Sequence, residues 1–139
     1  MKIPRSLKDE LTEQQAWLFQ EMKCKVVEES YSPKEFGDST LTIESKSLRI
    51  RFVRDRGQVF VAVASPVDPN TWWNLEDMFE FILHKKVRPE FDLQSVSSLL
   101  RNNFTALINS LGLKLDETKR ELTKRVHQKE REALKRLRE

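Results

Sequence analysis

The chain has 139 residues, with 25 Lys and Arg against 22 Asp and Glu, so its formal net charge is +3. Charged residues make up 34% and hydrophobic residues 38%, which suits a single folded domain and excludes wholesale disorder. No apolar run reaches the roughly 18–20 residues of a membrane span, and the first residues lack a signal-peptide core. The single cysteine excludes an internal disulfide. We therefore expect a cytoplasmic protein that needs no membrane, metal or cofactor.

The positive charge is concentrated at the C-terminus. Residues 114–139 hold 10 Lys and Arg against 6 Asp and Glu, whereas residues 1–113 are close to neutral. Residues 115–138 contain neither Gly nor Pro, and opposite charges recur four residues apart. We predict an α+β domain over 1–113 and a charged helical extension over 114–139, packed on the domain or projecting from it.

The first segment has a helical pattern. Ser6 can cap a helix, with Asp9 three residues further on, and apolar residues follow at helical spacing. This pattern predicts a helix over about 7–23. Residues 24–31 are compatible with either a longer helix or a strand.

Residues 40–64 alternate between apolar and polar side chains, which is typical of strands with one buried face. Short connections separate three such runs, and Gly57 can adopt the positive φ of a tight turn. We predict an antiparallel meander of three to four strands. The expected register pairs the following residues: Ile43 with Leu48, Ile50 with Val61, and Phe52 with Val59.

Helical signals return after a break at Pro66-Val-Asp-Pro69. Asn74 is a suitable N-cap for a helix with acidic residues in its first turn. Asp92 and Gly112 can open and close a third helix over about 93–111. The fold class predicted is therefore α+β, with amphipathic helices packed on the antiparallel meander and a long charged C-terminal helix.

Catalytic candidates are few. Cys24 has cationic neighbours, and His84 or His127 can in principle act as a base, but no motif links these residues. The two histidines do not have the spacing of metal ligands. Acidic residues such as Glu76 and Glu80 suit the start of a helix. The pattern favours a protein that is not an enzyme.

Two arginines stand out in the predicted sheet. Arg49 and Arg51 lie two residues apart on one strand and so share a face, and Phe60 lies on the same face of the next strand. One member of the Trp72-Trp73 pair is expected in the core and the other at a surface, and we assign Trp73 to the surface. These residues predict a surface that binds an acidic protein. In the alternative interpretation, Arg51 packs over Phe60 and a helix covers part of the face.

The C-terminal helix offers a second hypothesis, binding of nucleic acid. Its acidic residues dilute that potential, and its thin apolar stripe also allows self-association. The bases expected to contact phosphate are Lys119, Arg120, Lys124, Arg125, Lys129 and Arg131.

Phe36-Gly37 and the run from Leu48 to Gln58 match a pattern, FG…LRxRFVRDRGQ. This pattern resembles a hairpin found in small bacterial α+β proteins, and the resemblance spans about residues 20–85. It implies no activity and no functional residues. By analogy, some small bacterial proteins of this kind neutralise secreted toxins as immunity partners. The function predicted is a protein-interaction module, immunity-like or regulatory.

Overall fold

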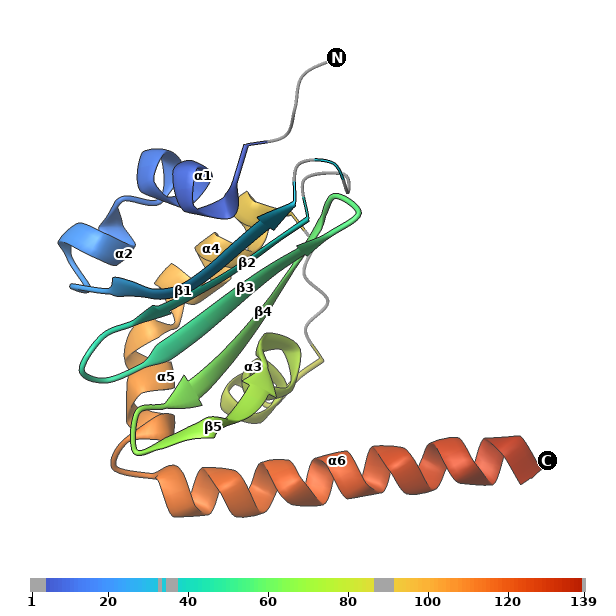
Figure 1. The fold of residues 1–139 in the computed structure, drawn as a ribbon. Helices are drawn as coiled ribbons and strands as arrows, with labels where there is room; N and C mark the ends of the chain where they lie inside the picture. Colours follow the sequence, from blue (N-terminus) through green and yellow to red (C-terminus); the bar gives the residue numbers. More distant parts are fainter. Residues whose placement is uncertain (1–4, 33, 35–37, 87–91, 139) are drawn as a thin grey trace.

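The fold was obtained as a computed structural model, which describes residues 5–32, 34, 38–86 and 92–138 (Figure 1). Two short helices precede five strands, and four further helices follow. In chain order the elements are α1 (Leu7–Gln14), α2 (Trp17–Gln20), β1 (Lys25–Ser32), β2 (Asp38–Glu44), β3 (Arg49–Asp55), β4 (Gln58–Ser65), β5 (Asp68–Asn74), α3 (Leu75–Leu83), α4 (Leu93–Asn102), α5 (Phe104–Leu111) and α6 (Leu115–Arg138).

The strands form one antiparallel sheet in the order β1-β2-β3-β4-β5, which confirms the predicted α+β class and meander. The count of three to four strands was too low because both edge strands lack clean alternation. In β1 the residues are mostly exposed and the pairing shifts between Val26 and Glu28. In β5 two residues of the expected break, Asp68 and Pro69, lie within the strand. An edge position tolerates proline, which lacks an N–H to donate.

The register differs from the predicted pairing by two residues. Ile43 pairs with Ile50, and Phe52 pairs with Val61. The causes are the two connections: residues 45–48 lie between β2 and β3, and only Arg56 and Gly57, with φ values of 52° and 84°, lie between β3 and β4. A shift of two residues preserves the orientation of every side chain. The predicted inner and outer faces of β2–β4 are therefore confirmed although the partners are not.

Side-chain caps open three helices as predicted. In each of these helices, the backbone N–H of the residue three positions later donates to the side chain of the cap. The three caps are Ser6, Asn74 and Asp92. The helix expected over 7–23 is instead two short helices, because the backbone leaves the helical conformation at Gln15, where φ is −128° and ψ is 46°.

The helix expected over 93–111 is also divided, at Asn103. The Asn103 amide donates to the Leu99 carbonyl at 3.0 Å, a local bond that competes with a continuous helix. The predicted C-terminal helix is confirmed as α6.

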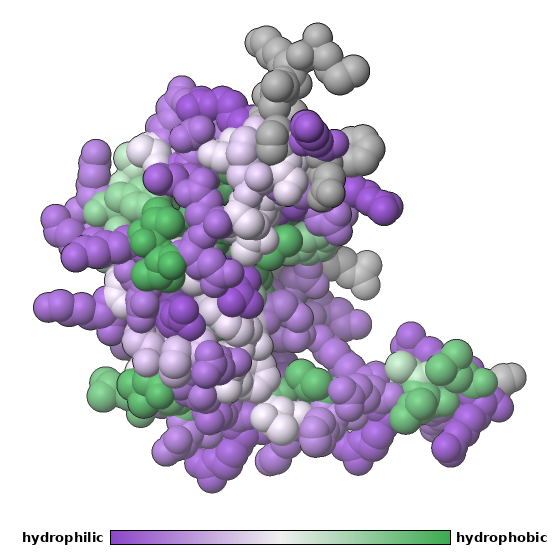
Figure 2. Space-filling view, in the orientation of Figure 1, coloured by the Kyte–Doolittle hydropathy of each residue, from purple (hydrophilic) through white to green (hydrophobic). Residues whose placement is uncertain are grey.

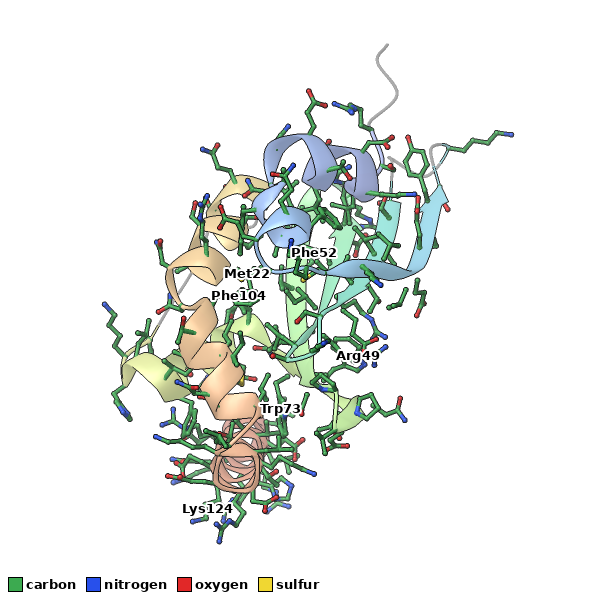
Figure 3. All side chains as sticks on the ribbon, turned by 90° about the vertical axis from the view of Figure 1, so that its left-hand side faces the viewer. Met22, Arg49, Phe52, Trp73, Phe104 and Lys124 are labelled. Atoms are coloured by element: carbon green, nitrogen blue, oxygen red, sulfur yellow. The ribbon has the colours of Figure 1, made fainter. Side chains whose placement is uncertain are left out.

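One face of the sheet packs on helices and forms the core. Phe52 from β3 and Phe79 from α3 are completely buried there. Trp17 from α2 meets Phe104 from α5 edge to face, with ring centroids 5.7 Å apart. Figure 3 shows Phe52 on the side of these helices and Arg49 on the other side of the sheet.

Arg54 is a charged residue on the inner face. It is 8% exposed, and its guanidinium pairs with the Glu10 carboxylate and donates to the Arg5 carbonyl at 2.6 Å. No local sequence pattern indicates this contact between α1 and β3. Because burial of a lone guanidinium is costly, Glu10 stabilises the position of α1 on the sheet.

We predict that Glu10→Ala lowers the free energy of unfolding by about 3 kcal/mol, because it leaves the Arg54 charge buried without its partner. Urea denaturation followed by circular dichroism measures this change. Glu13→Ala is the matched control, since Glu13 pairs with Arg5 at an exposed site where such pairs contribute about 1 kcal/mol or less. Equal effects of the two substitutions would contradict the structural role of Glu10.

Candidate protein interface on the outer face of the sheet

The outer face is the side of β2–β5 that points away from the core helices. Residues that pair across adjacent strands are neighbours on this face. Arg51 lies between Thr42 of β2 and Ala62 of β4, and Arg49 lies between Glu44 of β2 and Ala64 of β4. The predicted common orientation of Arg49 and Arg51 is therefore confirmed. Phe60 also lies on this face, where it pairs with Val53 rather than with Arg51.

The ring of Trp72, on β5, packs against the guanidinium groups of both arginines. The guanidinium carbon of Arg51 lies 4.1 Å from the centroid of the Trp72 ring, and that of Arg49 lies 5.0 Å from it. Such contacts combine a cation–π attraction with packing of flat groups. The alternative interpretation was therefore correct in that Arg51 packs against an aromatic ring, but it named Phe60 where the structure has Trp72.

Polar contacts fix the two arginines further. Arg49 donates through Nη1 to the Pro69 carbonyl at 2.5 Å and lies 3.9 Å from the Glu44 carboxylate. Arg51 donates through Nε to the Thr42 hydroxyl at 3.4 Å. Among the described residues, Arg51 has no paired carboxylate, so its charge is less compensated than that of Arg49.

This arrangement makes a covering layer on the outer face. The Arg49 side chain is only 17% exposed, and Thr42 and Ala64 beneath the layer are completely buried. Arg51 and Trp72 are half-buried, whereas Phe60 is 41% exposed. A partner on this face would therefore meet the outer surfaces of Arg51, Trp72 and Phe60, with Arg49 largely beneath.

Trp73 is not part of this layer, contrary to its predicted place at the interface. It pairs with Val63 and packs against the buried core from the inner face. Adjacent residues of a strand point to opposite faces, so the two tryptophans separate. Recognition of β5 as a strand would have identified Trp72 as the outer one, but the surrounding prolines predicted a break.

The catalytic candidates do not form a site. Cys24 is 5% exposed, and burial raises the pKa of its thiol to about 11, although a hydrogen bond with Ser45 opposes the rise. His84 is the exposed C-cap of α3, and His127 is exposed on α6. In the described part of the chain, no three His, Cys, Asp or Glu side chains gather as metal ligands.

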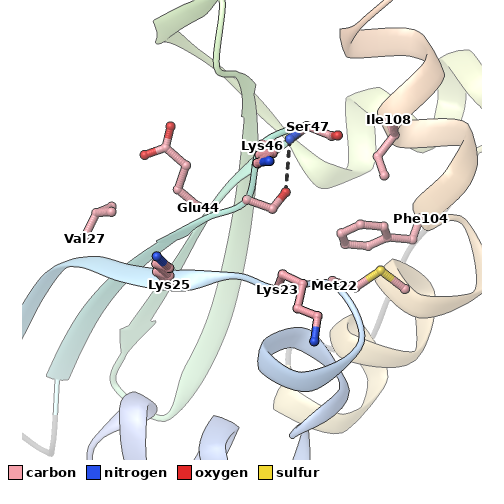
Figure 4. A pocket seen from close by; sticks show the side chains of 10 residues that line it. Met22, Lys23, Lys25, Val27, Glu44, Lys46, Ser47, Phe104 and Ile108 are labelled. Atoms are coloured by element: carbon pink, nitrogen blue, oxygen red, sulfur yellow. Dashed lines mark hydrogen bonds between the residues drawn. The ribbon is translucent and has the colours of Figure 1, made fainter.

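A pocket of about 590 Å³ lies near Cys24, between the start of β1, the β2–β3 loop and α5 (Figure 4). Met22, Phe104 and Ile108 form an apolar wall, and three lysines lie around the pocket. Cys24 is not among the lining residues, so the thiol does not face this space. The lysines are Lys23, Lys25 and Lys46.

The six predicted nucleic-acid contacts on α6 fall into two groups. Three are engaged with neighbouring side chains: Lys119 with Asp68 at 2.6 Å, Lys129 with Asp77 at 2.7 Å, and Arg125 with Glu121 at 3.6 Å. These ion pairs lower the pKa of Asp68 and raise the pKa of Lys129. The other three residues, Arg120, Lys124 and Arg131, are exposed.

The apolar stripe of α6, proposed for self-association, is also divided. Leu122 is buried against the body and Leu115 packs on the core, whereas Leu134 and Leu137 are 56% and 84% exposed. In Figure 1 the C-terminal part of α6 extends beyond the rest of the fold. Self-association through this end stays a prediction.

Comparison with known proteins adds no functional assignment: the chain matches no family model, no curated protein and no solved structure. The predicted resemblance to small bacterial hairpin proteins is therefore untested, and part of its pattern, Phe36-Gly37, lies outside the described residues. No helix within the described ranges is both long enough and apolar enough to cross a membrane.

We predict that Cys24 of the folded protein reacts slowly with a thiol reagent at pH 7.5, because a thiol with a pKa of about 11 is almost entirely protonated there and the sulfur is buried. Absorbance of the released thiolate of Ellman's reagent measures the rate. Unfolding in urea is the control and should accelerate the reaction at least tenfold. Rapid labelling of the folded protein would restore Cys24 as a candidate nucleophile.

Proposed function

We propose that this protein is a non-catalytic protein-interaction module that binds an acidic partner through the outer face of its sheet. The observation that supports this most is the arrangement of Arg51, Trp72 and Phe60 on the outer face of the sheet, the side on which Figure 3 shows Arg49. Arginine and aromatic side chains are the residue types that contribute most to protein interfaces.

The layer is suited to binding because its side chains are already held in place. Trp72 and Thr42 restrain the Arg51 guanidinium, so little side-chain freedom remains to be lost on association. A carboxylate of a partner would add a charge-assisted hydrogen bond to Arg51, which lacks such a partner among the described residues.

Phe60 adds an apolar contact to this charge. It lies next to the layer on β4, and more than a third of its surface is exposed. A partner that presents an acidic residue beside an apolar one could contact both the Arg51 guanidinium and the Phe60 ring. The resemblance to small bacterial α+β proteins adds the expectation that the partner is a protein whose activity is neutralised or regulated.

We expect Arg51→Glu combined with Phe60→Ala to reduce partner affinity by at least thirtyfold, because the charge now repels an acidic partner and the apolar contact is lost. The partner is first identified by affinity capture and mass spectrometry, and its dissociation constant is then measured with purified proteins by calorimetry. Arg49 is left unchanged because its contact with Pro69 holds β5 in place.

Lys46→Glu is the matched control, since it makes the same charge reversal in the exposed β2–β3 loop. It should leave the affinity within about twofold. Circular dichroism shows whether the double variant is folded. Undiminished binding by the folded double variant, or an equal loss with the control, would show that the outer face is not the contact surface.

A further inference from the structure

Five exposed cations of α6 lie along one side of the helix, whereas the exposed Lys129 and Arg136 lie on the opposite side. With His127 between the second and the third of the five, their positions from 120 to 138 are separated by three or four residues, which is the spacing of one helical face. At about 100° per residue they fall within an arc of about 80°, and at 1.5 Å per residue they extend over about 27 Å. This basic stripe consists of Arg120, Lys124, Arg131, Lys135 and Arg138, with His127 at its edge, and all six are exposed.

The acidic residues of α6 interrupt the basic stripe less than the linear sequence suggests. Glu130 and Glu132 project from the two flanks, about 60° from the nearest member of the stripe. Glu121, next to the stripe, is paired with Arg125. At the N-terminal start of the helix, Glu117 follows the same line as the stripe and Asp116 lies beside it. The dilution of positive charge expected from the sequence is therefore concentrated at this end of the stripe.

The opposite side of α6 is attached to the body, and this fixes the direction of the basic stripe. Thr118 and Leu122 are completely buried, and Lys129 reaches Asp77 and Glu80 on α3 at 2.7 and 3.3 Å. Lys119 reaches Asp68 on β5. Figure 3, in which α6 is seen end on, shows Lys124 pointing away from the body. The stripe therefore faces solvent.

We propose that the basic stripe of α6 binds duplex nucleic acid through its phosphates, without reading base sequence. Five cations distributed over about 27 Å of helix can displace counterions from a duplex, which carries one negative charge about every 1.7 Å along its axis. An α-helix also fits the roughly 12 Å wide major groove of B-form DNA. The stripe contains no Phe, Tyr or Trp side chain that would stack on the bases of a single strand.

An anionic membrane fits this helix less well than a duplex. Helices that bind at a membrane surface insert an apolar face and place their cations beside it. The apolar residues in the first half of α6 face the body, where Leu122 is buried, whereas Leu134 and Leu137 are exposed near the C-terminal end, where Figure 2 shows a short hydrophobic patch. Insertion of more than this short end would require α6 to detach from α3 and β5.

The test measures binding of the full chain to a fluorescently labelled 20-base-pair duplex by anisotropy between 20 and 200 mM NaCl. If five cations contact phosphates, the plot of log affinity against log salt has a slope of about −4 to −5. Two duplexes of unrelated sequence should bind within twofold of each other. A single strand of the same length should bind more weakly.

The variant carries Lys124→Gln, Arg131→Gln and Lys135→Gln, all at exposed positions of α6. Because it removes three phosphate contacts, it should bind the duplex at least tenfold more weakly at 50 mM NaCl and reduce the slope by about 3. The matched control removes the same charge from the region of the pocket, through Lys23→Gln, Lys25→Gln and Lys46→Gln. It should bind within about twofold of the unchanged chain.

Three results would overturn the proposal. The first is no duplex binding at 20 mM NaCl, and the second is an equal loss of affinity in the variant and the control. The third is tighter binding to vesicles of equal parts phosphatidylserine and phosphatidylcholine than to the duplex. The Arg51→Glu, Phe60→Ala double variant should keep its duplex affinity within about threefold, so this test is separate from that of the proposed protein interface.

Discussion

The two-residue period of β3 determines how the two faces of this protein are built. Ile50 and Phe52 point into the core, and Arg49 and Arg51, between and beside them, point outward. A shift of this strand by one residue would move the apolar side chains out of the core and the arginines into it. The position of the core residues and that of the outer arginines are therefore coupled. Arg54 follows the inward set, and Glu10 supplies the charge that makes its burial tolerable.

Trp72 connects the outer face to the edge of the sheet. A single indole ring packs against two guanidinium groups, and the Pro69 carbonyl accepts a hydrogen bond from one of them. The arginines are thus part of the structure as well as part of a surface. This dual role explains why Arg51, with its less compensated charge, is a better candidate for partner contact than the more buried Arg49.

The sequence allowed accurate prediction where the pattern is local and strong. Alternation over 40–64 predicted β2, β3 and β4, capping residues predicted helix starts at Ser6, Asn74 and Asp92, and charge spacing predicted α6. The first edge strand was left open between helix and strand because β1 contains a pairing irregularity and no buried residues, and β5 was missed because it contains a proline. Their contribution depends on pairing across the sheet, which no local pattern reveals.

The candidate surfaces were predicted less well for the same reason. Assignment of Trp73 rather than Trp72 to the surface followed directly from missing β5. On α6, a count of charges along the chain does not show how the charges are distributed around the helix, and the contacts of Lys119 and Lys129 depend on acidic residues of β5 and α3.

The irregularity of β1 also protects the open edge of the sheet. Its charged residues, including Glu28 and Glu29, and the pairing shift beside Val26 make that edge a poor template for strand addition, which guards the sheet against aggregation into larger β assemblies.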